Sequence, residues 1–216
     1  MTALNRSQQD NIFDPAAARP VTVIGAGSVG SQVVCSLAKI GVERLRVFDH
    51  DCVESHNICM SAYRPADLGV YKVRALAEIV REQSGLDIVA EERRYAGEPL
   101  RDAVVACVDS MAARRLIWEA VRQNPNVGIL VDTRVAIELV SVFAVNPSDQ
   151  DDIAYYEHFL YPDEAALRPM CGEHGLDPVA KMATALAVMS LTNVWTYGKT
   201  RRHLKWLAGE MKLLAD

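Results

Sequence analysis

A short apolar strand that runs into a glycine-rich turn constrains this chain more than any other feature. Val21–Ile24 is a β-branched run without a polar face, which is typical of a strand buried on both sides of a parallel sheet. Gly25, Gly27 and Gly30 follow it, with Ala26 between the first two. In a nucleotide-binding turn, the first glycine permits the turn, the second lets backbone approach phosphate, and the third lets helix pack on strand.

The residues after the turn extend this prediction. Residues 32–40 have apolar positions at helical spacing, and Gly41 is placed to end a helix. The next strand, Leu45–Phe48, ends in Asp49, and an acid at that position can bond ribose hydroxyls. The pattern predicts a nucleotide-binding unit. The alternative is a glycine-rich turn in a related fold that has lost its ligand.

An ordered series of polar residues follows this unit. The series comprises Asp49, Asp51, Glu54, Asn57, Gly69, Lys72, Asp109 and Arg114. It resembles the ThiF/MoeB/HesA superfamily, the adenylating domain of ubiquitin-activating-type enzymes. That family has a glycine-rich turn, a D-x-D-x-V-E pair, an asparagine, a G-x-x-K, and a strand that ends in Asp with an Arg beyond it. The resemblance covers most of the chain.

The resemblance implies that the ligand is ATP. Asp51 and Asn57 would lie near the ribose and the metal-bound phosphates. Lys72 would stabilise charge on the α-phosphorus and on the leaving pyrophosphate. The alternative for Lys72 is a surface lysine paired with an acid such as Glu78.

The chain departs from the family pattern at Met60, where the family has a phosphate-contacting arginine. A methionine cannot neutralise phosphate charge. Either adenylation is weakened or lost, or Arg64 reaches the same oxygens by another route, because a guanidinium binds phosphate bidentately.

Asp109 follows an expected strand and would face the crevice where α/β folds bind ligands. Two interpretations compete for it. By resemblance, Asp109 coordinates Mg²⁺ on ATP. By local pattern, it caps the helix that begins after it.

Two further candidates come from the resemblance. Arg6, in Asn-Arg-Ser-Gln, would reach across a homodimer to the partner's ATP phosphates, and the alternative is a solvated arginine on a mobile tail. Cys171 matches a C-x-x-x-G motif whose cysteine accepts the acyl group in some relatives. Arg168 or His174 would lower its pKa, and the alternative is a packed or loop thiol.

Composition excludes several other classes of protein. The net charge of −5 argues against a nucleic-acid partner or an anionic membrane partner. No apolar run reaches membrane-span length and no signal peptide is recognised, so the expected location is cytoplasmic. The five cysteines never form a CxxC pair, so we expect no structural zinc.

We predict a Rossmann-like α/β fold, with a doubly wound, mainly parallel sheet and helices on both faces. Residues 1–19 would be an N-terminal arm, and residues 20–216 a single adenylation domain with a crossover segment at about 146–177. The expected strands after the second are 86–91, 103–108, 127–132 and 136–145, the last perhaps antiparallel. The expected later helices are 65–81, 111–122, 179–197 and an amphipathic 200–214.

By resemblance, the reaction is MgATP-dependent adenylation of the C-terminal Gly-Gly carboxylate of a ubiquitin-like or sulfur-carrier protein by a homodimer. Three alternatives stay open. An NAD-type dehydrogenase would use the same turn and Asp49, but it gives Asp51, Asn57 and Lys72 no joint purpose. The others are a catalytically degenerate scaffold subunit and activation of a small acid or peptide terminus.

Overall fold

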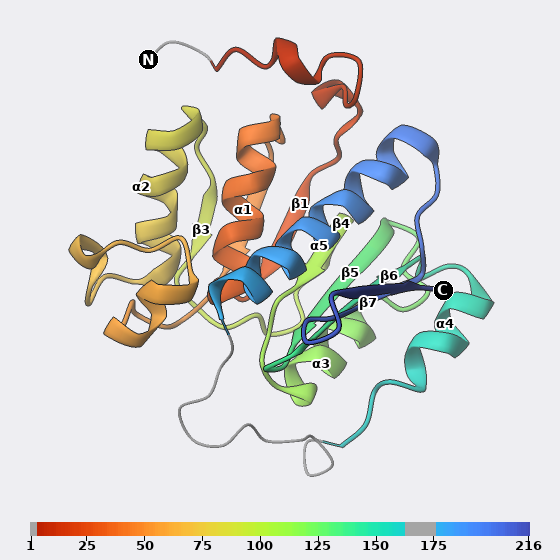
Figure 1. The fold of residues 1–216 in the computed structure, drawn as a ribbon. Coiled ribbons are helices and arrows are strands. Elements are labelled where there is room, and N and C mark those ends of the chain that lie inside the picture. The colour runs from red at the N-terminus through yellow and green to blue at the C-terminus, as the bar shows by residue number, and fades with distance from the viewer. Residues whose placement is uncertain (1–3, 163–175) are drawn as a thin grey trace.

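The chain folds around one eight-stranded sheet with strand order β3-β2-β1-β4-β5-β6-β7-β8 (Figure 1). The computed structural model describes residues 4–162 and 176–216. The strands β3, β2, β1, β4 and β5 are parallel, and β6, β7 and β8 are antiparallel to their neighbours. The predicted fold class, an α/β fold with a mainly parallel sheet, is confirmed.

The strands and helices have the following bounds. The strands are β1 Val21–Ile24, β2 Leu45–Phe48, β3 Val89–Glu91, β4 Asp102–Ala106, β5 Val127–Val135, β6 Leu139–Val145, β7 His203–Leu207 and β8 Lys212–Ala215. The helices are α1 Ser28–Ile40, α2 Lys72–Ser84, α3 Met111–Val121, α4 Gln150–Glu157 and α5 Asp177–Tyr197. Short 3-10 turns are η1 Ser7–Gln9, η2 Pro15–Ala17, η3 Ser55–Met60 and η4 Pro65–Asp67.

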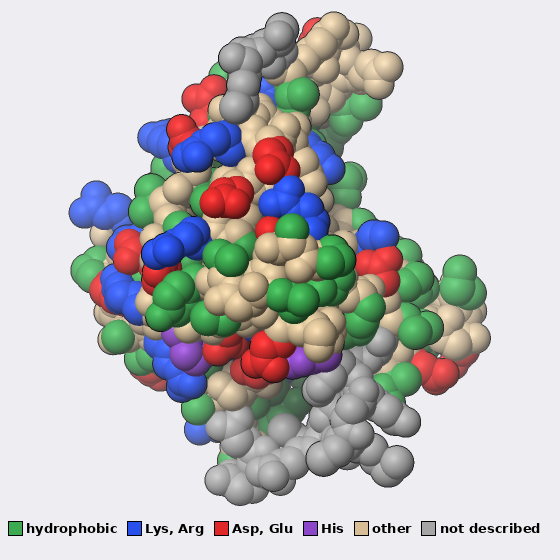
Figure 2. Space-filling model, turned by 90° about the vertical axis from the view of Figure 1, so that its left-hand side faces the viewer, with side chains coloured by type: hydrophobic (Ala, Val, Ile, Leu, Met, Phe, Trp, Pro, Cys, Tyr) green, Lys and Arg blue, Asp and Glu red, His purple; other side chains and the backbone are tan. Residues whose placement is uncertain are grey.

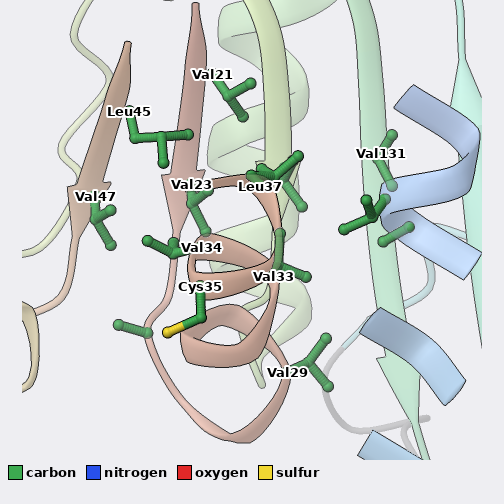
Figure 3. Packing of buried hydrophobic residues seen from close by; sticks show 14 of the residues in the cluster. Val21, Val23, Val29, Val33, Val34, Cys35, Leu37, Leu45, Val47 and Val131 are labelled. Atoms are coloured by element: carbon green, nitrogen blue, oxygen red, sulfur yellow. The ribbon is translucent and has the colours of Figure 1, made fainter. Parts of the chain in front are cut away.

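Helices cover both faces of the sheet, as expected of a doubly wound fold. The helices α1, α2 and α5 pack against one face and α3 and α4 against the other. Figure 3 shows how α1 contributes Val33, Val34 and Leu37 to a core with Val23 of β1 and Val47 of β2. These five side chains are fully buried. The sheet reverses its strand order between β1 and β4, so the crevice at their carboxyl ends is the place where such folds bind ligands.

The helix α1 begins four residues before the predicted start at Gln32. Its N-cap is Gly27, and the glycine turn therefore passes straight into the helix. The end at Ile40 was predicted correctly, because Gly41 adopts a left-handed conformation (φ 99°) and its N–H bonds the last carbonyls.

Two other predicted helices are wrong in part or whole. The predicted helix 65–81 divides into η4 and α2, because Gly69 has a positive φ of 79° between them. The predicted helix 200–214 is the β7–β8 hairpin. Its apolar residues fit a strand as well as a helix, and pairing with the edge of β6 decides between the two.

The last sheet strands confirm the antiparallel prediction for the segment after residue 136, although β6 begins at Leu139. Within residues 4–162 and 176–216, no helix is long and apolar enough to cross a membrane, and this holds for the 21-residue α5.

Candidate functional site

The glycine turn between β1 and α1 is fixed by close packing at two of its three glycines. Gly25 has a φ of 94°, and a Cβ there would lie 2.5 Å from the carbonyl oxygen of Cys107. A Cβ at Gly30 would lie 1.9 Å from the carbonyl oxygen of Gly25. Gly27 differs, because among residues 4–162 and 176–216 no atom beyond its own chain neighbours lies within 4 Å of a Cβ built on it. Its missing side chain therefore leaves backbone open to a ligand.

The first turn of α1 presents backbone N–H groups beside this open backbone. Gly27 caps the helix without a side chain, so the N-cap residue itself takes none of those donors. A helix N-terminus of this kind attracts anions through its N–H groups and its dipole. The turn can therefore accept a phosphate.

Asp49, at the end of β2, connects the glycine turn to the next loop. It is buried, and its Oδ2 accepts a hydrogen bond from the Ala26 N–H at 2.7 Å. Its Oδ1 accepts from the Asp51 N–H at 2.9 Å. Each oxygen keeps a second lone pair, so a ribose contact by Asp49 stays a prediction.

Lys72 is the first residue of α2, and its side chain returns to the loop after β2. Its Nζ donates to Asp51 Oδ2 at 2.9 Å, and its N–H donates to the Asp51 carbonyl at 2.8 Å. Lys72 is only 8% exposed, whereas the Asp51 side chain is 48% exposed. The alternative partner, Glu78, forms no ion pair with Lys72 in the described part of the chain, and Asp51 takes this place. The lysine is thus held at the crevice by an acid that water can reach.

The pKa of Asp51 lies below its usual range. Partial burial raises this pKa, but the hydrogen bond and charge of Lys72, with weaker help from His50 and Arg94, outweigh burial. Asp51 is therefore ionised at neutral pH.

Asn57 lies in η3 and helps to shape the same loop. Its Oδ1 accepts a hydrogen bond from the Glu54 N–H at 2.9 Å, as part of a capping box. The residue is half-buried. The side-chain oxygen Oδ1 therefore stabilises the loop, and the side-chain NH₂ group is the part that could contact a ligand.

Met60 and Arg64 both have firm local contacts. The Met60 carbonyl accepts from Gln32 Nε2 at 2.8 Å. Arg64 bonds Asp67 through its N–H at 2.7 Å and through Nη2 at 3.0 Å, and its Nη1 pairs with Glu82. Arg64 would have to release these acids before it could bind a phosphate.

Asp109 is exposed and lies between β4 and α3, as predicted from the strand pattern. Ser110, and not Asp109, is the N-cap residue of α3, with its Oγ accepting from the Ala113 N–H at 3.2 Å. Ser110 therefore caps α3 in place of Asp109. The metal interpretation stays a prediction.

Arg114 has a structural part that its motif position did not reveal. It is buried, and its Nε pairs with Asp132 Oδ1 at 3.0 Å. Its other nitrogens donate to the carbonyls of Val108, Ser110 and Thr133. Arg114 therefore joins the ends of β4 and β5 and fixes the loop that carries Asp109.

Asp132 was not singled out in the sequence, although an acid at the end of an apolar strand is a signal that could have identified it. It has no exposed surface. Besides Arg114, it accepts from Arg134 Nε at 2.8 Å and from the Tyr156 hydroxyl at 3.0 Å. These contacts make a buried polar cluster beside the crevice.

Arg6 lies at the opposite end of α1 from the glycine turn. Its Nε donates to the Lys39 carbonyl at 2.9 Å and its Nη2 to the Ala38 carbonyl at 3.3 Å. The 13 residues of α1 span roughly 20 Å. Arg6 therefore cannot serve the turn of its own chain in this arrangement. Cys171, with Arg168 and His174, lies outside the described residues.

One group of potential metal ligands occurs in the described part of the chain. The ligand atoms of Asp49, His50 and Asp51 lie within 4.8 Å of one another. Both oxygens of Asp49 already accept backbone N–H groups, and Asp51 binds Lys72. These hydrogen bonds indicate that the two acids stabilise the loop rather than coordinate a metal ion.

The fold and the turn define an α/β protein of the Rossmann-like class with an anion-accepting helix N-terminus. Within this class the family is established by sequence: a model of the ThiF family matches residues 8–198, and the chain belongs to that family.

Relatives and solved structures agree with this assignment. The chain is 29% identical over 144 residues to ubiquitin-like modifier-activating enzyme 5 of Drosophila melanogaster, covering 57% of this chain and 35% of that protein. It is 30% identical over 129 residues to the enzyme of the same name from Branchiostoma floridae, covering 50% of this chain and 32% of that protein. The chain thus spans about a third of the length of these curated relatives.

Among crystal structures, E. coli MccB with ATP has a TM-score of 0.70 at 15% identity, covering 94% of this chain and 64% of that one. The crystal structure of PaaA has a TM-score of 0.73 at 14% identity, with the same coverage. At these identities the likeness shows the fold.

Proposed function

We propose that this chain binds ATP and adenylates a carboxylate, with release of pyrophosphate. The observation that carries the proposal is the position of Lys72. Its ammonium is nearly buried at the start of α2 and is held by Asp51, whose backbone N–H is tied through Asp49 to the glycine turn. A cation and an anion-accepting helix terminus joined through one network suit a polyphosphate better than a neutral ligand.

In the proposed reaction, a carboxylate oxygen of the substrate attacks the α-phosphorus of ATP. The bond from that phosphorus to the bridging oxygen breaks, and pyrophosphate leaves with the electron pair. Lys72 exchanges Asp51 for phosphate oxygens and stabilises the charge that develops there. Asp49, Asp51 and Asn57 shape the loop that would receive the ribose and phosphates.

Magnesium would accompany the nucleotide. Mg²⁺ binds proteins through one or two carboxylates together with water and substrate phosphates. The exposed carboxylate of Asp109, on a loop that Arg114 holds, fits this requirement. When bound, the ion would neutralise phosphate charge.

A homodimer would account for Arg6 and for the exposed side of α5. Arg6 is remote from its own glycine turn, so only a partner's site could use it. Met189 and Tyr197 of α5 are exposed large apolar residues. In the dimer, α5 would form the contact and the N-terminal arm would cross to the partner.

The names of the relatives support a macromolecular carboxylate as substrate. The curated relatives are ubiquitin-like modifier-activating enzymes, and crystal structures of MccB include complexes with MccA. We therefore propose that the substrate is the C-terminal Gly-Gly carboxylate of a ubiquitin-like or sulfur-carrier protein. The alternative substrate is the terminus of a peptide. Cys171 is the proposed internal acyl acceptor.

A second candidate function is a catalytically degenerate subunit that keeps the fold and pairs with an active partner. Two observations favour it: Met60 stands where the family has an arginine, and Arg64 is bound to Asp67 and Glu82. In this case the chain would bind ATP without forming an adenylate.

The test is ATP–pyrophosphate exchange by the purified chain, with and without small proteins that end in Gly-Gly. We expect carrier-dependent exchange in the wild type and loss of about 10²- to 10³-fold in Lys72→Ala. Arg81→Ala, which removes an exposed basic side chain in the last turn of α2 that pairs with Asp87, is the matched control and should leave exchange unchanged. Binding of ATP without exchange for any carrier would favour the degenerate subunit, and failure to bind ATP would refute both functions.

A further inference from the structure

Ala26, between the first two glycines of the turn, is held at both of its backbone polar groups. Its N–H donates to Asp49 Oδ2 at 2.7 Å, and its carbonyl accepts from the Tyr63 hydroxyl at 2.6 Å. Ala26 has no exposed surface and Tyr63 is almost fully buried. Neither the turn's sequence nor the family pattern pointed to Tyr63.

The carbonyl of Ala26 and the N–H of Gly27 belong to one peptide group. A trans peptide is planar, so its C=O and N–H point in opposite directions. A hydrogen bond that fixes the carbonyl of Ala26 therefore fixes the direction of the Gly27 N–H. Within the described residues, that N–H donates no hydrogen bond.

Gly27 is the position where such a restraint matters most. A glycine has the widest choice of backbone conformations, and open space surrounds this one. Without a restraint, the peptide between Ala26 and Gly27 could rotate and turn its N–H away from an incoming anion. No side chain of Gly27 exists to oppose that rotation.

Tyr63 is itself held in place by the start of α1. The Ala62 N–H donates to Ser31 Oγ at 3.1 Å, and Gln32 Nε2 donates to the Met60 carbonyl at 2.8 Å. Two hydrogen bonds therefore tie the segment 60–63 to the helix whose N-terminus faces the crevice.

The Tyr63 hydroxyl also keeps its proton. Burial raises the pKa of Tyr63 well above its ordinary value, and the nearby charge of Asp49 raises it further. The phenol therefore remains a hydrogen-bond donor at neutral pH.

We propose that Tyr63 is a positioning residue, which aims the Gly27 N–H at the phosphates of the bound nucleotide by holding the Ala26 carbonyl. The inference rests on the proposed ATP site for its ligand. The geometry on which it stands belongs to the chain alone and can be tested without nucleotide.

The variant is Tyr63→Phe, which keeps the buried ring and removes one hydroxyl. One hydrogen bond of about 1 kcal/mol corresponds to about fivefold in affinity, so ATP should bind about fivefold more weakly. Adenosine, which lacks phosphates, should bind within about twofold of the wild type. An equal loss for ATP and adenosine would overturn the proposal, because it would indicate general damage to the site.

The matched control is Tyr95→Phe. The Tyr95 hydroxyl donates to the Glu98 carbonyl at 2.7 Å and is also nearly buried, but it packs in the core on the other face of the sheet. Tyr95→Phe should leave ATP affinity unchanged.

A second measurement keeps this proposal separate from the proposed function. In nitrogen-labelled protein without nucleotide, Tyr63→Phe should shift or broaden the Gly27 amide resonance, and Tyr95→Phe should not. An unchanged Gly27 resonance in a folded Tyr63→Phe variant would overturn the positioning role. If the wild type binds no ATP, the proposed function fails and this resonance alone decides about Tyr63.

Discussion

The pairs Lys72–Asp51 and Arg114–Asp132 both join a basic side chain to a carboxylate near the carboxyl edge of the sheet, yet water reaches only one of them. Asp51 is 48% exposed in its side chain and Asp132 is 0% exposed. The Asp51 carboxylate contacts Lys72 and the exposed His50, whereas Asp132 is surrounded by Arg114, Arg134 and Tyr156. We call these the open pair and the closed cluster.

The difference indicates which charges can change partner. An ion pair whose carboxylate is half-exposed contributes less to stability than a fully buried one, because water competes for the carboxylate, so the lysine can exchange it for a phosphate at lower cost. A buried pair cannot be broken without leaving a charge in a dry environment. The open pair therefore suits ligand binding, and the closed cluster suits the support of the loop that carries Asp109.

The face of the molecule that carries α2, whose first residue is Lys72 of the open pair, has charged side chains of both signs. Figure 2 shows acidic and basic side chains side by side on the face where α2 lies. Two exposed arginines of α2 form ion pairs, Arg74 with Glu92 and Arg81 with Asp87. This mixture gives no continuous basic surface on that face.

The largest expected effect is on stability, in the closed cluster. Asp132→Ala should lower the free energy of unfolding by about 3–5 kcal/mol, because it leaves Arg114 buried without its carboxylate. Asp51→Ala should change it by less than about 1 kcal/mol. Urea denaturation of both variants measures the difference, and equal losses would contradict the division into an open pair and a closed cluster.

A pH effect should come from His203, which lies next to the closed cluster. His203 is buried, stacks on Phe143, and bonds Ser141 through Nε2 at 2.7 Å and Tyr155 through Nδ1 at 2.9 Å. Its pKa is lowered to about 4, chiefly by burial; the charges of Lys205 and Arg134 also lower it, and Asp216 opposes them.

The unfolded chain, in which this histidine has its ordinary pKa of 6.5, binds the proton more tightly than the folded chain. Above about pH 6.5 the imidazole is neutral in both states, so the folded state keeps its full stability there. This stabilisation should fall as the pH drops toward 4, by about 3 kcal/mol at most. Thermal unfolding at pH 7 and pH 4.5 should show a smaller difference in His203→Gln than in the wild type. The same pH sensitivity in both proteins would assign the effect to other groups.

The smallest expected effect concerns Met60, the last residue of η3 in the loop that follows Asp51 along the chain. Met60→Arg would add a cation where the family has one. A charge-assisted hydrogen bond to phosphate at a partly exposed position contributes about 1 kcal/mol, so we expect ATP affinity to rise about fivefold. Calorimetry measures this change, with Met60→Gln as an uncharged control of similar length. Unchanged affinity in Met60→Arg would mean that Lys72 and the helix terminus already meet the charge of the phosphates.

The sequence by itself determined the parallel part of the fold. Strands β1 and β2 were placed correctly, because short β-branched runs that end in a glycine or an acid permit few alternatives. The end of α1 was also determined locally, since Gly41 must take the left-handed conformation. The order of motif residues was enough to establish the ThiF resemblance, which the family match confirms.

Only the tertiary structure decided which side chains meet. The segment 200–214 carries apolar residues compatible with either a helix or a hairpin, and the free edge of β6 made it a hairpin. The partners Asp51 for Lys72, Asp132 for Arg114 and Ala26 for Tyr63 are separated by 21, 18 and 37 positions. Hydrogen bonds between distant residues depend on strand order and register, which local periodicity does not encode.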